Sequence, residues 1–175
     1  MRRSTKPTAE DGSFEVVRDA RGDIRPNPDV RPGFWETHTL EEFTPAEWEA
    51  TCDGCGLCCL FKISDEGRCH YTNVACRLLD HHSCQCMHYE HRKDIVTDCI
   101  VFDFERLTEI ESWLPRTCAY RRLYNGQPLE PWHHLLSDTR ESVHDAGISI
   151  RGKCLPEWEA DIDRLEHHII ELPEP

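Results

Sequence analysis

Four cysteines fall within eight residues of this chain, in the stretch CDGCGLCC. They are Cys52, Cys55, Cys58 and Cys59. Two consecutive Cys-x-x-Cys spacings place the first three thiols around a tight turn. Gly54 and Gly56 let the backbone adopt positive φ there, so that amide N–H groups point toward sulfur. The stretch therefore predicts a metal-binding turn.

Further cysteines follow at intervals, for a total of eleven. Cys69 and Cys154 lie apart in polar surroundings, and we expect them to be ordinary thiols. The candidate metal ligands are Cys52, Cys55, Cys58, Cys59, Cys76, Cys84, Cys86, Cys99 and Cys118. This set is one thiol larger than two four-sulfur sites require. Because side chains of adjacent residues diverge, we expect Cys58 and Cys59 to face different sites, or one of them to be spare.

The identity of the metal stays open, because the ligand set suits both zinc and an iron–sulfur cluster. The opening spacing resembles that of ferredoxins, but Leu60 and Phe61 stand where a ferredoxin continues toward Cys-Pro. Zinc ribbons have two separated Cys-x-x-Cys pairs, whereas Cys84 and Cys86 have a single residue between them. Neither standard pattern is therefore matched.

The charge balance restricts the class of partner. A net charge of −13 lacks the surplus of Lys and Arg that phosphate neutralisation needs, which argues against nucleic acid and against an anionic membrane surface. No apolar run approaches the roughly 20 residues of a membrane span. A protein partner remains open but is not identified by any motif.

The first ten residues lack the apolar segment of a secretory signal, so we expect a cytoplasmic protein. In a reducing compartment, closely spaced cysteines bind metal more often than they form disulfides. An odd cysteine count also fits a disulfide framework poorly.

Composition divides the chain in two. Residues 1–33 mix proline, glycine and charges of both signs, which predicts a disordered N-terminal arm. Residues 34–175 form the predicted cysteine-cluster metal-binding domain, ending in an amphipathic helix. We expect a mainly α fold, small and irregular, with short helices and long loops organised around a cysteine-ligated metal centre.

Helix signals recur through this domain. Thr44, Pro45 and Glu47 form a capping box that begins a helix over 45–51. Further helices are expected over 103–114, 117–125, 138–147 and 156–169. The last is predicted from an apolar stripe made by Trp158, Ile162, Leu165 and Ile169. Residues 71–79 are expected to be a short strand turning into a helical segment that carries Cys76, and residues 80–98 a loop pinned by Cys84, Cys86 and Cys99.

Other polar side chains offer weaker candidates. Three histidine pairs are expected at the surface, although His133 and His134 lie in a turn that would reach an open metal position. Arg92 lies between Cys86 and Cys99, where it would either donate hydrogen bonds toward sulfur or close the loop.

The sequence resembles the CxxCxxCC family of zinc- or iron-chelating proteins, and within it the YcgN-like branch, UPF0260. The matching segments are FWETHTLEEFTPAEWEA at 34–50, CDGCGLCC at 52–59, VACRLLD at 74–80, CQCMHY at 84–89, Asp98-Cys99, WLPRTCAYR at 113–121 and ESVHDAGISIRG at 141–152. The resemblance implies a metal-chelating domain whose ligands come from the nine cysteines above. The wider family resembles the cysteine-cluster part of flagellin lysine methylases, where an iron–sulfur cluster is implicated. Methyl transfer is not carried over, because no glycine-rich turn follows a strand here.

Two functional hypotheses follow. The leading one is a cysteine-cluster protein that chelates an iron–sulfur cluster or zinc, with any reaction unknown. The alternative is a zinc-stabilised interaction module without catalysis, whose partner surface lies around Trp35, Trp132 and Trp158. Whether the protein is an enzyme is left undecided.

Overall fold

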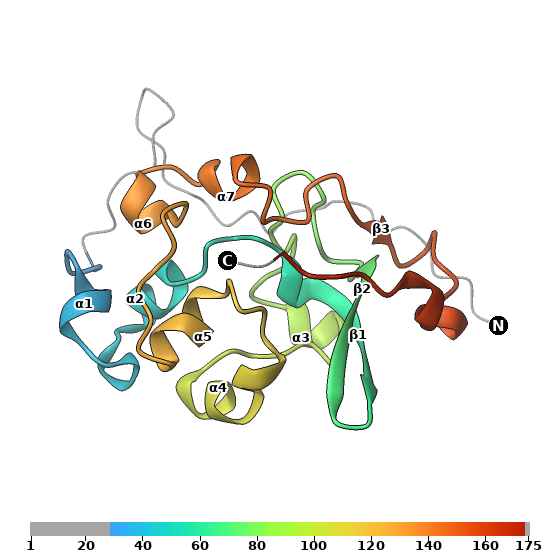
Figure 1. Ribbon diagram of the computed structural model, residues 1–175, viewed down its shortest axis with the longest axis horizontal. Coiled ribbons are helices and arrows are strands. Elements are labelled where there is room, and N and C mark those ends of the chain that lie inside the picture. The colour runs from blue at the N-terminus through green and yellow to red at the C-terminus, as the bar shows by residue number, and fades with distance from the viewer. Residues whose placement is uncertain (1–28, 174–175) are drawn as a thin grey trace.

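The computed structural model describes residues 29–173 (Figure 1). The larger part of the predicted disordered arm, residues 1–28, lies outside these residues, as do residues 174–175. The helices are α1 (Phe34–Thr37), α2 (Pro45–Ala50), α3 (Arg92–Ile95), α4 (Phe104–Ile110), α5 (Ala119–Tyr124), α6 (His134–Ser137) and α7 (Ser142–Asp145), with the 3-10 helices η1 (Leu40–Glu42), η2 (Leu57–Cys59), η3 (Glu111–Trp113) and η4 (Ile162–His168). Among the described residues, no helix is long and apolar enough to cross a membrane.

A three-stranded sheet corrects the predicted fold class. Strands β1 (Leu60–Asp65) and β2 (Arg68–Ala75) form an antiparallel hairpin, and the short β3 (Leu155–Pro156) pairs with β2 in parallel. Helices hold 35% and strands 13% of the described residues, so the prediction of a mainly α fold is wrong and the fold is mixed.

The hairpin depends on a two-residue turn. Glu66 and Gly67 have φ values of 47° and 79°, the left-handed conformations of a tight hairpin turn that matches strand twist. The chain after this turn was predicted to become helical toward Cys76, but it stays extended as far as Ala75. Its aromatic and β-branched side chains favour a strand, and pairing with β1 satisfies its backbone.

The helices predicted over 45–51, 103–114, 117–125 and 138–147 are confirmed as α2, α4 with η3, α5 and α7. Side-chain caps account for two of their starts. Thr44 accepts a hydrogen bond from the Glu47 N–H in the predicted capping box, and Asp103 accepts one from the Arg106 N–H. Propensity and capping thus located these helices correctly.

The predicted amphipathic helix over 156–169 is absent, and this segment is the second correction. Apart from Pro156 of β3, its regular structure is η4, in which Arg164 has non-helical backbone angles, and Ile162 and Ile169 of the expected buried stripe are exposed. The chain instead follows β2, where the Ile170 N–H donates to the Tyr71 carbonyl at 2.9 Å. A hydrogen bond to the backbone of β2 thus takes the place of a hydrogen bond within a helix.

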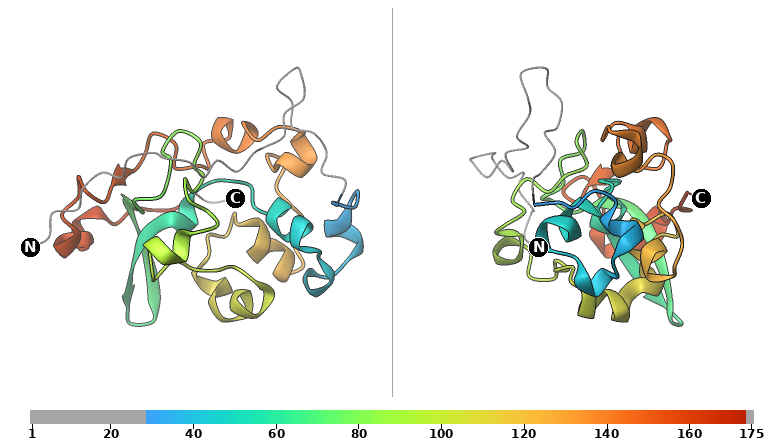
Figure 2. Two further views of the ribbon diagram at one scale, coloured as in Figure 1. Left: turned by 180° about the vertical axis from the view of Figure 1, so that it is seen from behind. Right: turned by 90° about the vertical axis from the view of Figure 1, so that its left-hand side faces the viewer.

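Two apolar clusters form the core. The first contains Cys55, Leu57, Leu60, Tyr71, Ala75, Leu79, Cys84, Val143, Ile148 and Ile150, and the second contains Leu40, Leu107, Leu114 and Tyr120. Figures 1 and 2 show the hairpin toward one end of the molecule and α1 toward the other, with the chain running from α2 to β1 between them. The stretch 52–59 therefore connects the two clusters.

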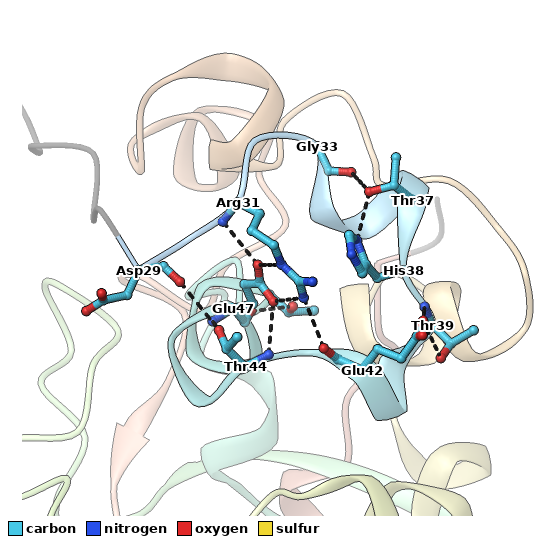
Figure 3. A network of polar contacts seen from close by, with 10 residues as sticks. Asp29, Arg31, Gly33, Thr37, His38, Thr39, Glu42, Thr44 and Glu47 are labelled. Atoms are coloured by element: carbon cyan, nitrogen blue, oxygen red, sulfur yellow. Dashed lines mark hydrogen bonds and ion pairs between the residues drawn. The ribbon is translucent and has the colours of Figure 1, made fainter.

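The described end of the predicted arm is attached to α2 by an ion pair (Figure 3). The Arg31 guanidinium donates to both carboxylate oxygens of Glu47 at 2.6 Å, and the Arg31 backbone N–H donates to the same group at 3.0 Å. Glu47 has no exposed surface, and it also accepts the Thr44 N–H at 2.9 Å. The hydrogen bond from Arg31 is the main reason that the pKa of Glu47 falls to about 2.

Replacing Glu47 by Gln should therefore destabilise the protein in a pH-dependent way. The folded-state pKa lies below the unfolded value, so the contribution of the carboxylate is present above about pH 4.5 and is lost as pH falls toward about 2. We expect the Glu47→Gln variant to have a lower urea midpoint than the wild type at pH 7, and the difference to shrink at pH 3. A difference that is equal at both pH values would contradict the ion-pair assignment.

Candidate metal centre

The stretch CDGCGLCC is shaped by backbone turns. After α2 ends, the Asp53 carboxylate accepts the Cys55 N–H at 3.0 Å. Gly54 and Gly56 have φ values of 79° and 76°, as the sequence predicts. Beyond η2, the Cys76 N–H donates to the Cys59 carbonyl at 2.9 Å. This last bond joins the stretch directly to the end of β2.

Gly56 has a second reason to be glycine. A Cβ atom built at this position would lie 2.9 Å from Ile150 Cγ1 and 3.1 Å from the Cys84 Cβ. Real Cβ atoms do not approach other heavy atoms so closely, and any other residue would also be strained at this φ. The turn is thus pressed against the first apolar cluster.

A first cysteine set gathers at this turn. It comprises Cys52, Cys55, Cys58 and Cys118. Burial raises the pKa of Cys55 well above its usual value, and the charges of Asp53, Cys58, Cys52 and Cys118 raise it further. Burial likewise raises the pKa of Cys118 to about 12, with Asp53 and Cys58 again contributing. The charges of Cys58 and Cys118 raise the pKa of both Cys52 and Cys55, so the four thiols lie near one another beside Asp53, although Cys58 also raises the pKa of Cys86 and Cys99.

A second cysteine set lies on the β2 side. It comprises Cys59, Cys76, Cys86 and Cys99. The hydrogen bond with Cys58 and burial raise the pKa of Cys59, and the charges of Cys76 and Cys86 raise it further. Burial raises the pKa of Cys76 and of Cys86, and the charge of Cys99 contributes to both. The adjacent Cys58 and Cys59 are therefore divided between the two sets while their thiols stay hydrogen-bonded to each other.

Backbone amides are directed at sulfur in both sets. The pairs of acceptor thiol and donor N–H are Cys52 with Gly54, Cys76 with Leu78, Cys86 with His88, and Cys118 with Tyr120. In each pair the donor lies two residues after the cysteine, and Cys118 also accepts the N–H of Arg121, three residues after it. Such N–H groups lower the pKa of the thiol, because they stabilise the negative charge of a thiolate. The local turns therefore suit sulfur that is ionised, as metal-bound sulfur is.

Cys58 differs from all other cysteines of the chain. A hydrogen bond from Cys59 lowers the pKa of Cys58 to about 7, and the charge of Lys62 acts in the same direction, whereas the pKa of every other cysteine is raised. The Lys62 ammonium donates to the carbonyls of Cys58 and Leu60 at 2.7 and 2.8 Å and lies 4.8 Å above the Tyr71 ring. A positive charge is thus held beside the junction of the two sets.

The ninth candidate, Cys84, lies in the core instead. It is 4% exposed, and burial raises its pKa to about 11 while the Ser149 hydroxyl hydrogen-bonds its thiol. Its nearby charges are those of Arg151 and Cys154. Cys84 packs in the first apolar cluster, as Cys55 also does, and of the nine predicted ligands it is the one apart from both sets; Cys69 and Cys154 belong to neither set.

The described residues do not form a ready-made coordination shell. Across residues 29–173, no group of three or more His, Cys, Asp or Glu side chains is arranged closely enough to hold a metal ion. The prediction that a cysteine-ligated metal centre organises the loops is therefore wrong. Apolar packing and the hydrogen bonds around residues 52–59 position them, and the thiols of each set are neighbours without the spacing of ligands on one ion.

Three side chains donate hydrogen bonds to the backbone carbonyls of the consecutive residues 50–52, where α2 ends and the first set begins. His134 Nε2–H donates to the Ala50 carbonyl at 2.9 Å, and His133 Nε2–H donates to the Thr51 carbonyl at 3.0 Å. Arg140 donates to the Cys52 carbonyl at 3.5 Å. These donors satisfy carbonyls at the negative end of α2, where uncompensated oxygen atoms would face the thiols.

This arrangement explains why His133 is not an available ligand. It is 2% exposed, and its Nδ1 accepts the Leu135 N–H at 3.2 Å, so both ring nitrogens are engaged. Its ring stacks on that of His134 at 4.7 Å. The pair that the sequence offered as a reserve metal ligand instead supports the backbone before Cys52.

Arg92 fulfils both of its predicted roles. Its guanidinium forms a hydrogen bond with Cys99 and stacks 3.8 Å from the centre of the Tyr89 ring. The Tyr89 hydroxyl in turn donates to Glu49 of α2 at 2.7 Å. The loop that carries the second set is thus tied back to the helix that precedes the first.

Sequence reasoning missed two cationic residues at the centre. Lys62 lies on β1 and Arg140 is 88 residues away from the carbonyl it binds, and no spacing rule connects either one with the cysteines. The tryptophans proposed as a partner surface, Trp35, Trp132 and Trp158, are each half-buried.

Comparison with known proteins identifies the family. A UPF0260 protein of Rhizobium etli is 51% identical over 142 residues, covering 80% of this chain and 89% of that protein. A UPF0260 protein of Rhodobacter capsulatus is 50% identical over 144 residues, covering 81% and 96%. The chain belongs to the UPF0260 family. A member from Cellvibrio japonicus is 47% identical over 139 residues, covering 78% of this chain and 94% of its own length.

The family assignment confirms the UPF0260 branch of the resemblance. The names of these relatives give a family designation without an activity or a metal. No family model matches the chain, and no solved structure matches it.

The role of His133 leads to a stability prediction. A His133→Phe variant keeps a ring but leaves the Thr51 carbonyl and the Leu135 N–H without their side-chain partner, which should cost about 1–3 kcal/mol. The matched control is His167→Phe, at a side chain that is 57% exposed, where a change within about 0.5 kcal/mol is expected. Urea unfolding of both variants tests this; equal losses would show that the buried bonds of His133 are unimportant.

Proposed function

We propose that the protein binds metal through two four-cysteine sites, with an iron–sulfur cluster or zinc as cofactor, in the cytoplasm. The first site would use Cys52, Cys55, Cys58 and Cys118, and the second would use Cys59, Cys76, Cys86 and Cys99. Bound zinc would supply a cross-link, and a bound cluster would supply electron transfer. Cys84 is left out because the charged groups near its thiol are Arg151, Cys154 and Asp80, and none of the other eight candidate ligands.

The observation that carries this proposal is the grouping of the thiols. Eight of the nine candidate cysteines lie near one another and form two groups of four joined through Cys58, which acts on members of both, and four is the number of ligands that either cofactor requires. In addition, four of the eight accept a backbone N–H from the residue two positions later. Core packing alone would not produce such turns.

The pKa values indicate that metal binding would require these thiols to lose their protons. Burial raises the pKa of seven of these eight thiols, so they are protonated at neutral pH without metal, and binding must release protons. Metal affinity should therefore increase with pH. Binding would also draw the sulfurs toward a common distance of about 2.3 Å from a zinc ion.

Metal content, acid-labile sulfide and the visible spectrum of anaerobically purified protein test the proposal. Cys55→Ser should remove the first site and Cys76→Ser the second, so each should lose about half of the metal, and the double variant nearly all of it. Cys69→Ser and Cys154→Ser are matched controls, because these cysteines belong to neither set.

The results of these measurements distinguish an iron–sulfur cluster from zinc. Iron with sulfide would select the cluster, and colourless zinc would select the structural site. Metal content that is equal in the wild type and all five variants, or absent from the wild type, would overturn metal binding by these cysteines.

A further inference from the structure

Lys62 of β1 directs its side chain back toward the cysteine turn. Its ammonium donates to the Cys58 carbonyl at 2.7 Å and to the Leu60 carbonyl at 2.8 Å. It also lies 4.8 Å from the centre of the ring of Tyr71, which is the residue opposite Lys62 in the hairpin. Carbonyl oxygens and the face of an aromatic ring both attract a cation. The ammonium is therefore held at a fixed place beside η2.

The groups that hold this ammonium carry no charge. Among residues 29–173, no carboxylate forms an ion pair with Lys62, although the chain has a net charge of −13. Arg31, Arg122 and Arg151, by contrast, each pair with a glutamate. A cation bound only by neutral groups keeps its charge available for an anion that forms nearby.

The thiols near Lys62 come from both cysteine sets. Cys58 of the first set and Cys59 of the second are consecutive, and the Cys59 carbonyl accepts the Cys76 N–H at 2.9 Å. The charge of Lys62 interacts with the thiols of all three residues. Lys62 is thus a cation at the junction of the two sets.

Two other cations are each bonded within a single set. Arg140 donates to the Cys52 carbonyl of the first set at 3.5 Å, and Arg92 hydrogen-bonds Cys99 of the second set. Lys62 differs from both because it acts on members of the two sets together.

Metal binding would create negative charge around this ammonium. Four thiolates with one Zn²⁺, or with an oxidised four-iron cluster, retain a net charge of about −2, so two such sites would carry about −4. The protonated thiols of the metal-free chain are neutral. A fixed cation at the junction would therefore stabilise the metal-loaded state more than the metal-free state.

We propose that Lys62 is a positioning residue for metal binding, whose fixed positive charge offsets the negative charge of both four-cysteine sites and so increases their affinity for metal. The inference rests on the proposed metal-binding function and adds to it a residue outside the cysteines. A purely structural role, through the two bonds to carbonyls, would stabilise the metal-free and the metal-loaded chain alike. Such a role would leave the metal affinity unchanged, because affinity reports only the difference between the two states.

The zinc affinity of the full chain tests this role. Metal-free wild type and variants are titrated with Zn²⁺ against a chromophoric chelator at neutral pH, at low and at high ionic strength. Lys62→Met removes the charge and retains the length of the side chain, whereas Lys62→Gln removes the charge and retains a hydrogen-bond donor. Lys62→Arg keeps the charge. Lys153→Met is the matched control, because Lys153 also donates to a backbone carbonyl, that of Gly147, outside both sets.

We expect Lys62→Met and Lys62→Gln to raise the Kd for Zn²⁺ about three- to tenfold at low salt, as one charge near a partly solvated site should, and the effect to shrink at high salt. Lys62→Arg and Lys153→Met should remain within about twofold of the wild type. Urea unfolding of the metal-free proteins verifies that each variant is folded.

Equal affinities in the wild type and both charge-removing variants would overturn the role of Lys62 and leave metal binding intact. A loss of affinity that Lys62→Arg shares, or that persists unchanged at high salt, would also overturn it, because the charge would then be unimportant. A wild type that does not bind Zn²⁺ would overturn the inference as well. The metal content of the purified protein and of the Cys55→Ser and Cys76→Ser variants reports separately on the proposed function.

Discussion

The close approach of Gly56 to Ile150 and Cys84 is the contact on which the arrangement of the cysteines depends. Because no side chain fits there, the backbone of residues 52–59 lies directly on the first apolar cluster. At the other side of the same stretch, Cys52 packs against the second cluster. The turn is therefore held between two cores: Cys55 belongs to the first cluster and Cys59 packs against it, whereas Cys52 packs against the second. A metal site placed there would be supported on both sides without having to organise either one.

Hydrogen bonds, together with packing, hold the backbone of the turn in place. His134, His133 and Arg140 bond the carbonyls of three successive residues before the turn, and the Asp53 carboxylate closes the turn itself. All these donors come from a segment more than 80 residues further along the chain. Arg92 and Tyr89 connect the loop of the second set to α2. The thiols themselves contribute little to this framework, which explains how the chain can hold them near each other without forming a preformed coordination shell.

The two cysteine sets differ in the charged side chains that lie near them. Four thiols beside a buried carboxylate form an environment that disfavours additional negative charge. The second set has Arg92 and Lys93 at Cys99. The first set also reaches the surface, because Cys58 is exposed whereas the four cysteines of the second set are half-buried. Cys58, with its lowered pKa and the Lys62 charge nearby, lies at the junction between them.

The sequence by itself determined what is local. The spacing of cysteines and glycines predicted the turn at 52–59, and the capping signals predicted α2, α4, α5 and α7, because such features depend on residues within one or two helical turns. Tertiary structure decided the rest. The hairpin was overlooked although Glu66-Gly67 marks its turn, and the expected C-terminal helix yielded to contacts along β2. The division of cysteines into two sets, the burial of His133 and Cys84, and the cations at Cys99 also required the fold, because each depends on chain segments that only packing brings together.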